Sequence, residues 1–223
     1  MLAGDHPPTS GDRESLLRDP FSGAGTASIC NSGQLVDPAA EVRVSSPLPK
    51  EFTTSEVIAR RVQSTDLADL RRIDSDPNVM ETLGGVRDRD ATAADLKYDL
   101  EHWERHGFGL YLVKSARGEV VGRVGLRCRT FLGRREVEVA FSLRPMWWGR
   151  GLGTSLARRL VELARDSHLS ESLVATVEPA NLASIRVLEK LGFTADGQLR
   201  RAGTIMTLYR LDLEPFDQRS HAR

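Results

Sequence analysis

Three glycines alternate with other residues between Pro145 and Thr154, at Gly149, Gly151 and Gly153. Glycine adopts positive φ angles and permits close approach, so successive backbone N–H groups can turn inward and surround an anion. The stretch that follows predicts an amphipathic helix, whose first turn adds unpaired N–H groups and a positive dipole end. The spacing therefore indicates a receptor for a pyrophosphate that needs neither a metal nor a lysine. The alternative is an ordinary glycine-rich turn between a strand and a helix.

Two common phosphate-binding motifs do not fit this segment. A P-loop ends in Gly-Lys-Ser or Gly-Lys-Thr, whereas Thr154 and Ser155 follow Gly153. The dinucleotide fingerprint, counted from Gly149, requires glycine or alanine at Thr154 and a preceding βαβ strand. The strands predicted before this segment are linked by short hairpins instead. The expected ligand therefore belongs to another class of pyrophosphates.

The elements that must position this loop are strands and helices in mixed order. Apolar residues alternate with polar or small ones from Glu136 to Leu143, which predicts a strand with one buried face. Leucines at 152, 156, 160 and 163 predict a helix to about Arg165. The other predicted elements are a strand at 56–62, a short helix after 64–65 that Pro77 stops, a helix at 92–106, strands at 108–115, 120–130 and 173–177, a helix from 182 to Gly192 and two closing strands ending near 213.

The first fifty or so residues are rich in proline, glycine and serine, and Phe21 and Phe52 are their only aromatic residues. Such a stretch buries too little apolar surface to offset an ordering entropy of about 1–2 kcal/mol per residue. We expect a disordered tail at 1–53, one folded domain at 54–214 and a frayed end at 215–223. A misassigned start site or a docking tail is the alternative.

The chain has 223 residues, of which 31 are basic and 31 acidic, so its formal net charge is zero. This balance argues against a nucleic-acid or membrane-surface binder, and 40% apolar residues suffice for a sizeable core. Cys30 and Cys128 are too few for a disulfide scaffold. No apolar run reaches the ~20 residues of a membrane helix, and the N-terminus lacks a hydrophobic signal core. We expect a cytoplasmic protein.

The loop and a downstream segment together resemble one family. Arg150-Gly-Leu-Gly153, after the strand that ends at Leu143 and Pro145, resembles the acetyl-CoA loop of the GNAT acyltransferase superfamily. Asn181-Leu-Ala-Ser184 and Glu189-Lys-Leu-Gly-Phe193 resemble its second signature helix. The resemblance extends from about 56 to 213. Within the superfamily, Trp147-Trp148-Gly149 resembles the Rim-type branch, which acetylates α-amino groups of ribosomal proteins and other amines.

This resemblance implies a mixed α/β (α+β) fold, with a largely antiparallel sheet that splays between its fourth and fifth strands to hold acetyl-CoA. An outward-bulged strand at Phe141, Ser142 and Leu143 would pair its backbone with the pantetheine arm. The other residues implied to contact the cofactor are Trp148, Gly149, Arg150, Gly151, Leu152, Gly153, Thr154, Asn181 and Ser184. The sequence departs from the superfamily at Trp148, where Gln or Arg is common, and at Leu188, where many members keep a general-acid tyrosine.

Acyl transfer to an amine requires the neutral amine. Deprotonating a lysine at pH 7 costs about 4.6 kcal/mol, whereas an α-amine costs only about 1 kcal/mol and needs modest base assistance. Glu138 is the candidate base, acting through a water, since it lies on the polar face of the strand before the loop and aligns with a glutamate of many Rim-like members. Glu136 shares that face. The alternative is that both are solvated strand carboxylates.

Asn181 and Ser184 are three residues apart, so they share a helical face and can converge on one ligand. Asn181 would orient the pantetheine or the thioester, and Ser184 would donate a hydrogen bond to the departing thiolate or the carbonyl. Asn181 is also well suited to cap the helix after Pro179.

Two other signals receive no role. His102 and His106 have a zinc-compatible spacing, but Trp103 stands at the Glu position of His-Glu-x-x-His. Arg200 and Arg201 could meet an acidic substrate, although adjacent surface arginines are commonly only solvated. We therefore expect no metal.

The sequence predicts an N-acetyltransferase, monomeric or homodimeric, that uses acetyl-CoA as co-substrate to acetylate a protein N-terminal α-amine or a similar amine. Alternatives are an enzyme that acetylates an antibiotic, polyamine or amino acid, and a non-catalytic acyl-CoA-binding domain. No nucleic-acid or membrane partner is expected.

Overall fold

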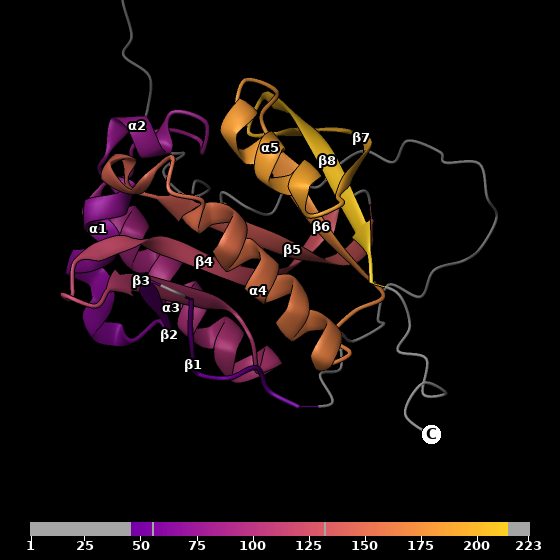
Figure 1. Cartoon of the computed structure of the whole chain (residues 1–223). Helices are drawn as coiled ribbons and strands as arrows, with labels where there is room; N and C mark the ends of the chain where they lie inside the picture. Colours follow the sequence, from indigo (N-terminus) through magenta and orange to yellow (C-terminus); the bar gives the residue numbers. More distant parts are fainter. Residues whose placement is uncertain (1–45, 55, 132, 214–223) are drawn as a thin grey trace, which may run out of the picture.

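The computed structural model describes residues 46–54, 56–131 and 133–213. They form an eight-stranded sheet in the order β1-β2-β3-β4-β5-β6-β8-β7, shown in Figure 1. All neighbouring strands are antiparallel except β5 and β6, which run parallel. The predicted mixed α/β fold with a largely antiparallel sheet is therefore confirmed.

The elements follow one another in the order that the sequence predicts, with additions at the N-terminal end. The strands are β1 (Glu51–Thr53), β2 (Val57–Arg61), β3 (Leu110–Ser115), β4 (Val120–Phe131), β5 (Arg134–Leu143), β6 (Ser172–Val177), β7 (Thr194–Arg201) and β8 (Thr204–Asp212). The α-helices are α1 (Leu67–Asp74), α2 (Pro77–Met80), α3 (Arg89–His106), α4 (Leu152–Asp166) and α5 (Leu182–Lys190). Short 3-10 turns at Ser64–Asp66 and Pro145–Trp147 precede α1 and the glycine loop.

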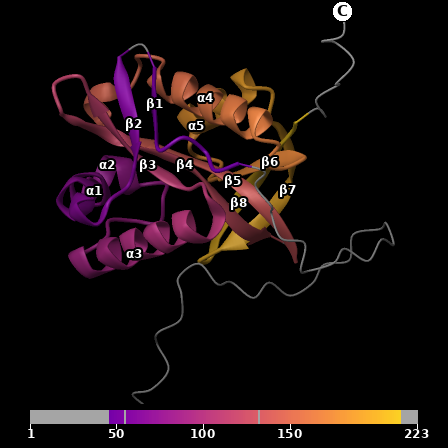
Figure 2. The same cartoon turned by 90° about the horizontal axis from the view of Figure 1, so that it is seen from below.

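Helices cover the sheet on both sides, as Figure 2 shows. We call the side covered by α1, α2 and α3 the α3 face, and the side covered by α4 and α5 the α4 face. The predicted leucine stripe of α4 is buried at Leu152, Leu156, Leu160 and Leu163. Burial of such a stripe stabilises a helix more than its intrinsic propensity does. The layers fix α4 against the sheet, with its first turn next to the end of β5.

The sheet splays where its two parallel strands meet. Among the described residues, the only register pair that joins β5 to β6 is Glu138↔Val174. Beyond Glu138, β5 continues to Leu143 with β4 as its partner strand. The predicted splay between the fourth and fifth strands is therefore present, between β5 and β6 once β1 is counted.

β1 was not predicted, and it lies inside the segment expected to be a tail. Leu48 and Phe52 are buried in the core, and β1 pairs with β2. The folded part therefore begins before the boundary set at residue 54. Residues 1–45 and 214–223, which include the rest of both predicted tails, lie outside the described residues.

Helix starts differ from the prediction where another side chain makes the cap. α3 begins at Arg89 rather than at Thr92, since the side chain of Asp88 accepts a hydrogen bond from the Ala91 N–H. Pro77 does not merely stop α1: it occupies the first turn of α2, where its missing N–H costs nothing. Gly107, the residue after the predicted helix at 92–106, caps α3 with φ +70°.

None of the helices in the described ranges is both long enough and apolar enough to cross a membrane.

Candidate active site

The glycine loop connects the end of β5 to the start of α4. Gly149 and Gly151 both have φ +74°, a conformation that residues with a Cβ rarely adopt. Apart from the glycine itself and its chain neighbours, no atom lies within 4 Å of the place where a Cβ would stand at either position. Gly151 is the N-cap of α4 and has no side chain to cap the first-turn N–H groups. We call residues 149–152 the glycine cradle; their backbone and the space beside it fit a pyrophosphate.

Side chains around the cradle hold it in place. Trp148 is 51% exposed and its Nε1 donates to the backbone oxygen of Leu143 at 2.7 Å. Trp147 is buried, and the Arg150 guanidinium lies over its ring at 4.7 Å. Gly153 sits under α5, where a Cβ would stand 3.7 Å from Val187. Trp148 and Arg150 therefore brace the loop, and their predicted contacts with the cofactor stay predictions.

The expected outward bulge at Phe141, Ser142 and Leu143 is wrong. Register pairs run without a break from Gly122↔Leu143 to Phe131↔Arg134. Gly122 permits this close pairing, since a Cβ there would lie 2.2 Å from the Ser142 backbone oxygen. The Ser142 hydroxyl accepts from Arg123 Nε at 3.2 Å on the α3 face, and the Leu143 side chain is buried beside α4. Any contact of these residues with a cofactor would use the strand's backbone.

Glu138 lies where β5 and β6 part, and its side chain is on the α3 face. It is 5% exposed, and its Oε1 accepts from the Thr176 hydroxyl at 2.6 Å. Arg201 Nη1 lies 3.5 Å from Oε1, and Arg129 Nε lies 3.6 Å from Oε2. Thr176, Arg201 and Arg129 therefore fix the carboxylate from three strands.

Glu136 is buried as well and forms a two-pronged ion pair with Arg210, with distances of 2.9 and 3.2 Å. This pairing raises the pKa of the Arg210 guanidinium above its usual value. The alternative in which Glu136 and Glu138 are both solvated is therefore wrong.

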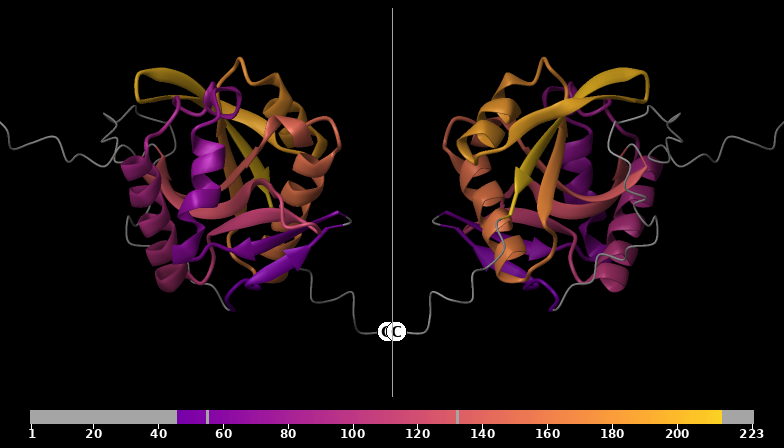
Figure 3. Two further views of the ribbon diagram at one scale, coloured as in Figure 1. Left: turned by 90° about the vertical axis from the view of Figure 1, so that its left-hand side faces the viewer. Right: turned by 90° about the vertical axis from the view of Figure 1, so that its right-hand side faces the viewer.

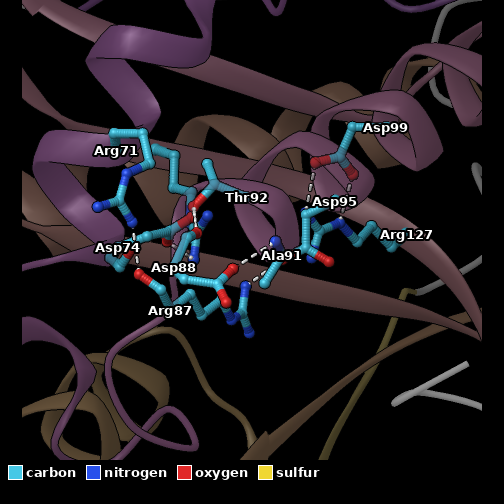
Figure 4. Close-up of polar contacts among 11 residues, drawn as sticks. Arg71, Asp74, Arg87, Asp88, Ala91, Thr92, Asp95, Asp99 and Arg127 are labelled. Carbon is cyan, nitrogen blue, oxygen red and sulfur yellow. Dashed lines mark hydrogen bonds and ion pairs between the residues drawn. The ribbon is translucent and has the colours of Figure 1, made fainter. Parts of the chain in front are cut away.

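Buried ion pairs join the central strand β4 to helices of the α3 face. Arg123 Nη2 lies 2.9 Å from Asp74, a fully buried carboxylate of α1. Arg127 donates two hydrogen bonds, of 2.9 and 2.7 Å, to Asp99 of α3, as Figure 4 shows. Burial by itself lowers the pKa of the Arg127 guanidinium. The interaction with Asp99 raises it by more, so the pKa of Arg127 lies above its usual value.

Figure 4 also shows how the segment between α2 and α3 is held: Arg87 pairs with Asp95, and Arg71 donates to the Arg87 backbone oxygen. Burial raises the pKa of the Asp95 carboxyl, although Arg87 opposes the shift. Sequence reasoning missed these pairs. The sequence signal that could have predicted them is arginine at 123, 127 and 129, three positions on one face of a strand with few other charged residues.

Asn181 and Ser184 lie together at the start of α5, next to the carboxyl end of β6. Asn181 caps the helix as predicted, with its Oδ1 accepting from the Ser184 N–H at 3.0 Å. Its Nδ2 donates to the Thr82 hydroxyl at 2.7 Å. Since Thr82 follows α2, this bond joins the two helical layers, which Figure 3 shows on either side of the sheet. Leu188 is fully buried in the core and supplies no general acid.

His102, His106 and Cys128 offer ligand atoms within 4.8 Å of one another. Both ring nitrogens of His102 are engaged: Nδ1 lies 2.8 Å from the Phe108 oxygen, and Nε2 accepts from the Cys128 N–H at 2.9 Å. Burial lowers the pKa of His102 to about 3, so the ring is neutral at pH 7. To bind a metal through Nε2, His102 would have to use the lone pair that already accepts the hydrogen bond from the Cys128 N–H. The imidazole thus serves to pin α3 to β4.

A sheet that splays at one parallel pair, beside a glycine-rich helix start, defines an acetyltransferase fold of the GNAT class. The family model for the acetyltransferase (GNAT) domain matches residues 56–194. The chain therefore belongs to the GNAT acetyltransferase family, and it is an N-acetyltransferase. The predicted Rim-type branch stays a prediction, because a ribosomal L7/L12 α-N-protein acetyltransferase matches at 15% identity with a TM-score of 0.62, which shows the fold alone.

The relatives whose names state a substrate include the following two. An L-methionine sulfoximine/L-methionine sulfone acetyltransferase of Pseudomonas aeruginosa is 34% identical over 119 residues, covering 50% of this chain and 69% of that protein. An L-amino acid N-acyltransferase of Escherichia coli is 36% identical over 95 residues, covering 42% of this chain and 55% of that protein.

Solved structures share the fold across most of their length. An acetyltransferase from Agrobacterium tumefaciens has a TM-score of 0.64 at 25% identity, covering 72% of this chain and 93% of its own. A putative acetyltransferase from Salmonella typhimurium, with its cofactor acetyl-CoA, has a TM-score of 0.55 at 26% identity, covering 72% of this chain and 95% of its own.

Proposed function

We propose that this enzyme transfers the acetyl group of acetyl-CoA directly to the α-amine of a small acceptor of the amino-acid type. One observation carries the choice of acetyl-CoA: beyond Glu138, β5 runs along the splay and leads straight into the glycine cradle. An extended pantetheine arm can pair with such a strand edge, and the pyrophosphate can bind the cradle. The relative with acetyl-CoA as its cofactor supports this assignment.

The names of the relatives favour a small acceptor over a protein N-terminus. The two relatives described above act, by their names, on an amino acid or an amino-acid analogue. An α-amine also suits the site, because about 1 kcal/mol suffices to deprotonate it at pH 7. The acceptor would approach from the α3 face, which carries Glu138 and the buried charges around it.

Glu138 and Ser184 receive the two proton-handling roles. The amine nitrogen attacks the thioester carbonyl carbon, the C–S bond breaks, and CoA leaves as a thiolate. Glu138 takes the proton of the attacking amine through a water, since its position at the parting of β5 and β6 is fixed by Thr176 and two arginines. Ser184 donates to the thiolate from the first turn of α5, and Asn181 orients the pantetheine from the same turn.

The test is a thiol-release assay with acetyl-CoA and a panel of amines: L-amino acids, methionine sulfoximine and sulfone, polyamines, an aminoglycoside and peptides with free N-termini. We expect turnover with free amino acids and little with peptides or polyamines. Faster turnover of peptides contradicts the proposed acceptor. Calorimetric binding of acetyl-CoA with no thiol release across the panel indicates a non-catalytic acyl-CoA-binding domain instead.

A further inference from the structure

The carboxyl end of β5 presents backbone groups to the splay. The Arg144 N–H donates to the Val121 oxygen at 2.8 Å, and Leu143 stands opposite Gly122 in the register of β4 and β5. In an antiparallel pair, the backbone groups of successive residues point alternately toward the partner strand and away from it. The N–H and C=O groups of Leu143 and Phe141 therefore point away from β4, toward the side of β6. In the described residues, the register pair between β5 and β6 lies further back along β5, so an extended ligand can pair with these groups.

The indole of Trp148 covers the last of these groups. Its Nε1 donates to the Leu143 oxygen at 2.7 Å. The 3-10 turn Pro145–Trp147 reverses the chain between the two residues, so the side chain folds back onto the end of the strand. Trp148 is nevertheless 51% exposed. A tryptophan whose N–H is bonded and whose ring is half open can present an apolar surface to a ligand.

The cofactor assigned to this site has an apolar unit that must pass this ring. In the proposed function, the diphosphate binds the glycine cradle and the pantetheine arm runs back along β5 toward Glu138, while the adenosine leads away on the other side of the diphosphate. Next to the diphosphate, the arm begins with the pantoyl unit, whose quaternary carbon carries two methyl groups; the amides follow. Trp148 directly precedes the cradle in the chain, and its indole is bonded to the end of the strand. The ring therefore lies where the arm passes from the cradle to the strand.

We propose that the indole ring of Trp148 is the contact surface for the pantoyl methyl groups of CoA. This inference rests on the proposed function and deepens it, since it names the part of the cofactor that one side chain recognises. Burying methyl groups against an apolar ring is favourable. The hydrogen bond to Leu143 holds the ring in place before the ligand arrives, which lowers the entropic cost of the contact.

The fluorescence of Trp148 can test this contact directly. The protein has three tryptophans, and the other two, Trp103 and Trp147, are 3% and 8% exposed. Acrylamide in solution should therefore quench mainly Trp148. The probes are CoA, ADP, which has the adenine and the diphosphate without the arm, and pantetheine, which has the arm alone. We expect CoA, and pantetheine at high concentration, to protect Trp148 from acrylamide, whereas ADP should not. In Trp148→Phe, quenching should be weak and unchanged by CoA.

Calorimetry with CoA and ADP separates a contact with the arm from support of the cradle. Trp148→Ala should raise the Kd for CoA roughly tenfold, the value of burying two methyl groups, and leave the Kd for ADP unchanged. Trp148→Phe keeps a ring but loses the bond to Leu143, so the Kd for CoA should rise by about two- to tenfold. Met146→Ala is the matched control, because Met146 is an apolar residue of the same loop and is 55% exposed. Both Kd values should stay at the wild-type level in this variant.

Three results would overturn the contact. Protection of Trp148 by ADP to the same degree as by CoA would place the adenine on the ring. CoA binding without protection would leave the ring outside the site. An equal loss of CoA and ADP affinity in Trp148→Ala would show that the indole only supports the cradle. Each of these results leaves the proposed function intact if the enzyme still acetylates amino acids.

Other results decide on the proposed function separately. If CoA protects Trp148 and no amine is acetylated, the contact is supported and the proposed function is contradicted. If CoA does not bind at all, both are contradicted.

Discussion

The two faces of the sheet meet at the splay with different chemistry. On the α4 face, the cradle offers backbone N–H groups, left-handed glycines and a helix N-terminus, with no side-chain cap. On the α3 face, the site is built from buried charged side chains: Glu138, the arginines around it and the ion pairs behind them. A backbone site suits a cofactor that every member of a family shares. A side-chain site can change its charge pattern, and with it the acceptor, without disturbing the cofactor.

The largest expected effect comes from removing Glu138, the proposed base. Glu138→Gln should lower kcat by about a hundredfold or more, the usual range for general bases, and leave acetyl-CoA affinity unchanged. Steady-state kinetics and calorimetry measure the two effects. Glu136→Gln, on the same face but paired with Arg210, should keep nearly full turnover. Turnover of Glu138→Gln within twofold of wild type removes Glu138 from the mechanism.

The cradle is tested by giving it a side chain. Gly151→Ala puts a Cβ at φ +74°, which costs about 1–2 kcal/mol, and fills space assigned to the pyrophosphate. We expect stability to fall and the Kd for acetyl-CoA to rise by roughly tenfold.

Gly118 provides the matched control for Gly151, because it has φ +80° in the turn between β3 and β4 and equally open surroundings. Gly118→Ala should lower the melting temperature similarly and leave the Kd unchanged. Equal Kd values for both variants would place the pyrophosphate elsewhere.

The hydroxyl of Ser184 is predicted to act on the leaving group from the α4 face. Ser184→Ala should reduce kcat by about tenfold, the value of one hydrogen bond to a charged group, and change acetyl-CoA affinity little. The helix cap should persist, because the Ser184 N–H and not its hydroxyl is bound to Asn181. An unchanged kcat would assign Ser184 to the cap alone.

Thr82 links the two faces, and its removal should have a smaller effect. Thr82→Val keeps the shape but loses the 2.7 Å bond from Asn181 Nδ2. With the amide less fixed, the KM for acetyl-CoA should rise by about two- to tenfold, the value of one ordinary hydrogen bond, while kcat changes less. Thr82→Ser should restore wild-type values. If Thr82→Val changes only kcat, the bond does not serve the cofactor.

Substituting His102 should have the smallest effect on turnover, and its main effect should be on the pH dependence of folding stability. Its folded-state pKa of about 3 lies below the unfolded value of 6.5, so below pH 6.5 the unfolded chain binds the extra proton. Stability should therefore fall as the pH drops from 6.5 towards 3, by up to about 1.4 kcal/mol per pH unit from this group. Denaturant unfolding at several pH values measures the slope. His102→Gln should be less stable at pH 7.5 but show a shallower acid slope; an equal slope would assign it to other groups.

Most elements could be predicted because their signals are local. Alternation in β5, the leucine stripe of α4 and the terminating Gly107 depend on neighbours a few residues away. The prediction failed where distant partners decide. β1 has only three residues and forms because β2 is already in place beside it. The expected bulge at Phe141–Leu143 is absent, because Gly122 on β4 allows an unbroken register.

The sequence by itself determined the cradle, the helix that begins there and the cap at Asn181, since positive φ angles and helix ends are set by residue type over a few positions. Only the tertiary structure decided that Glu138 lies between Arg129 and Arg201, and that Asp74 and Asp99 neutralise the other two arginines of β4. Charge pairing of this kind depends on sheet register and on which helix covers which face, and no short stretch of the chain encodes either.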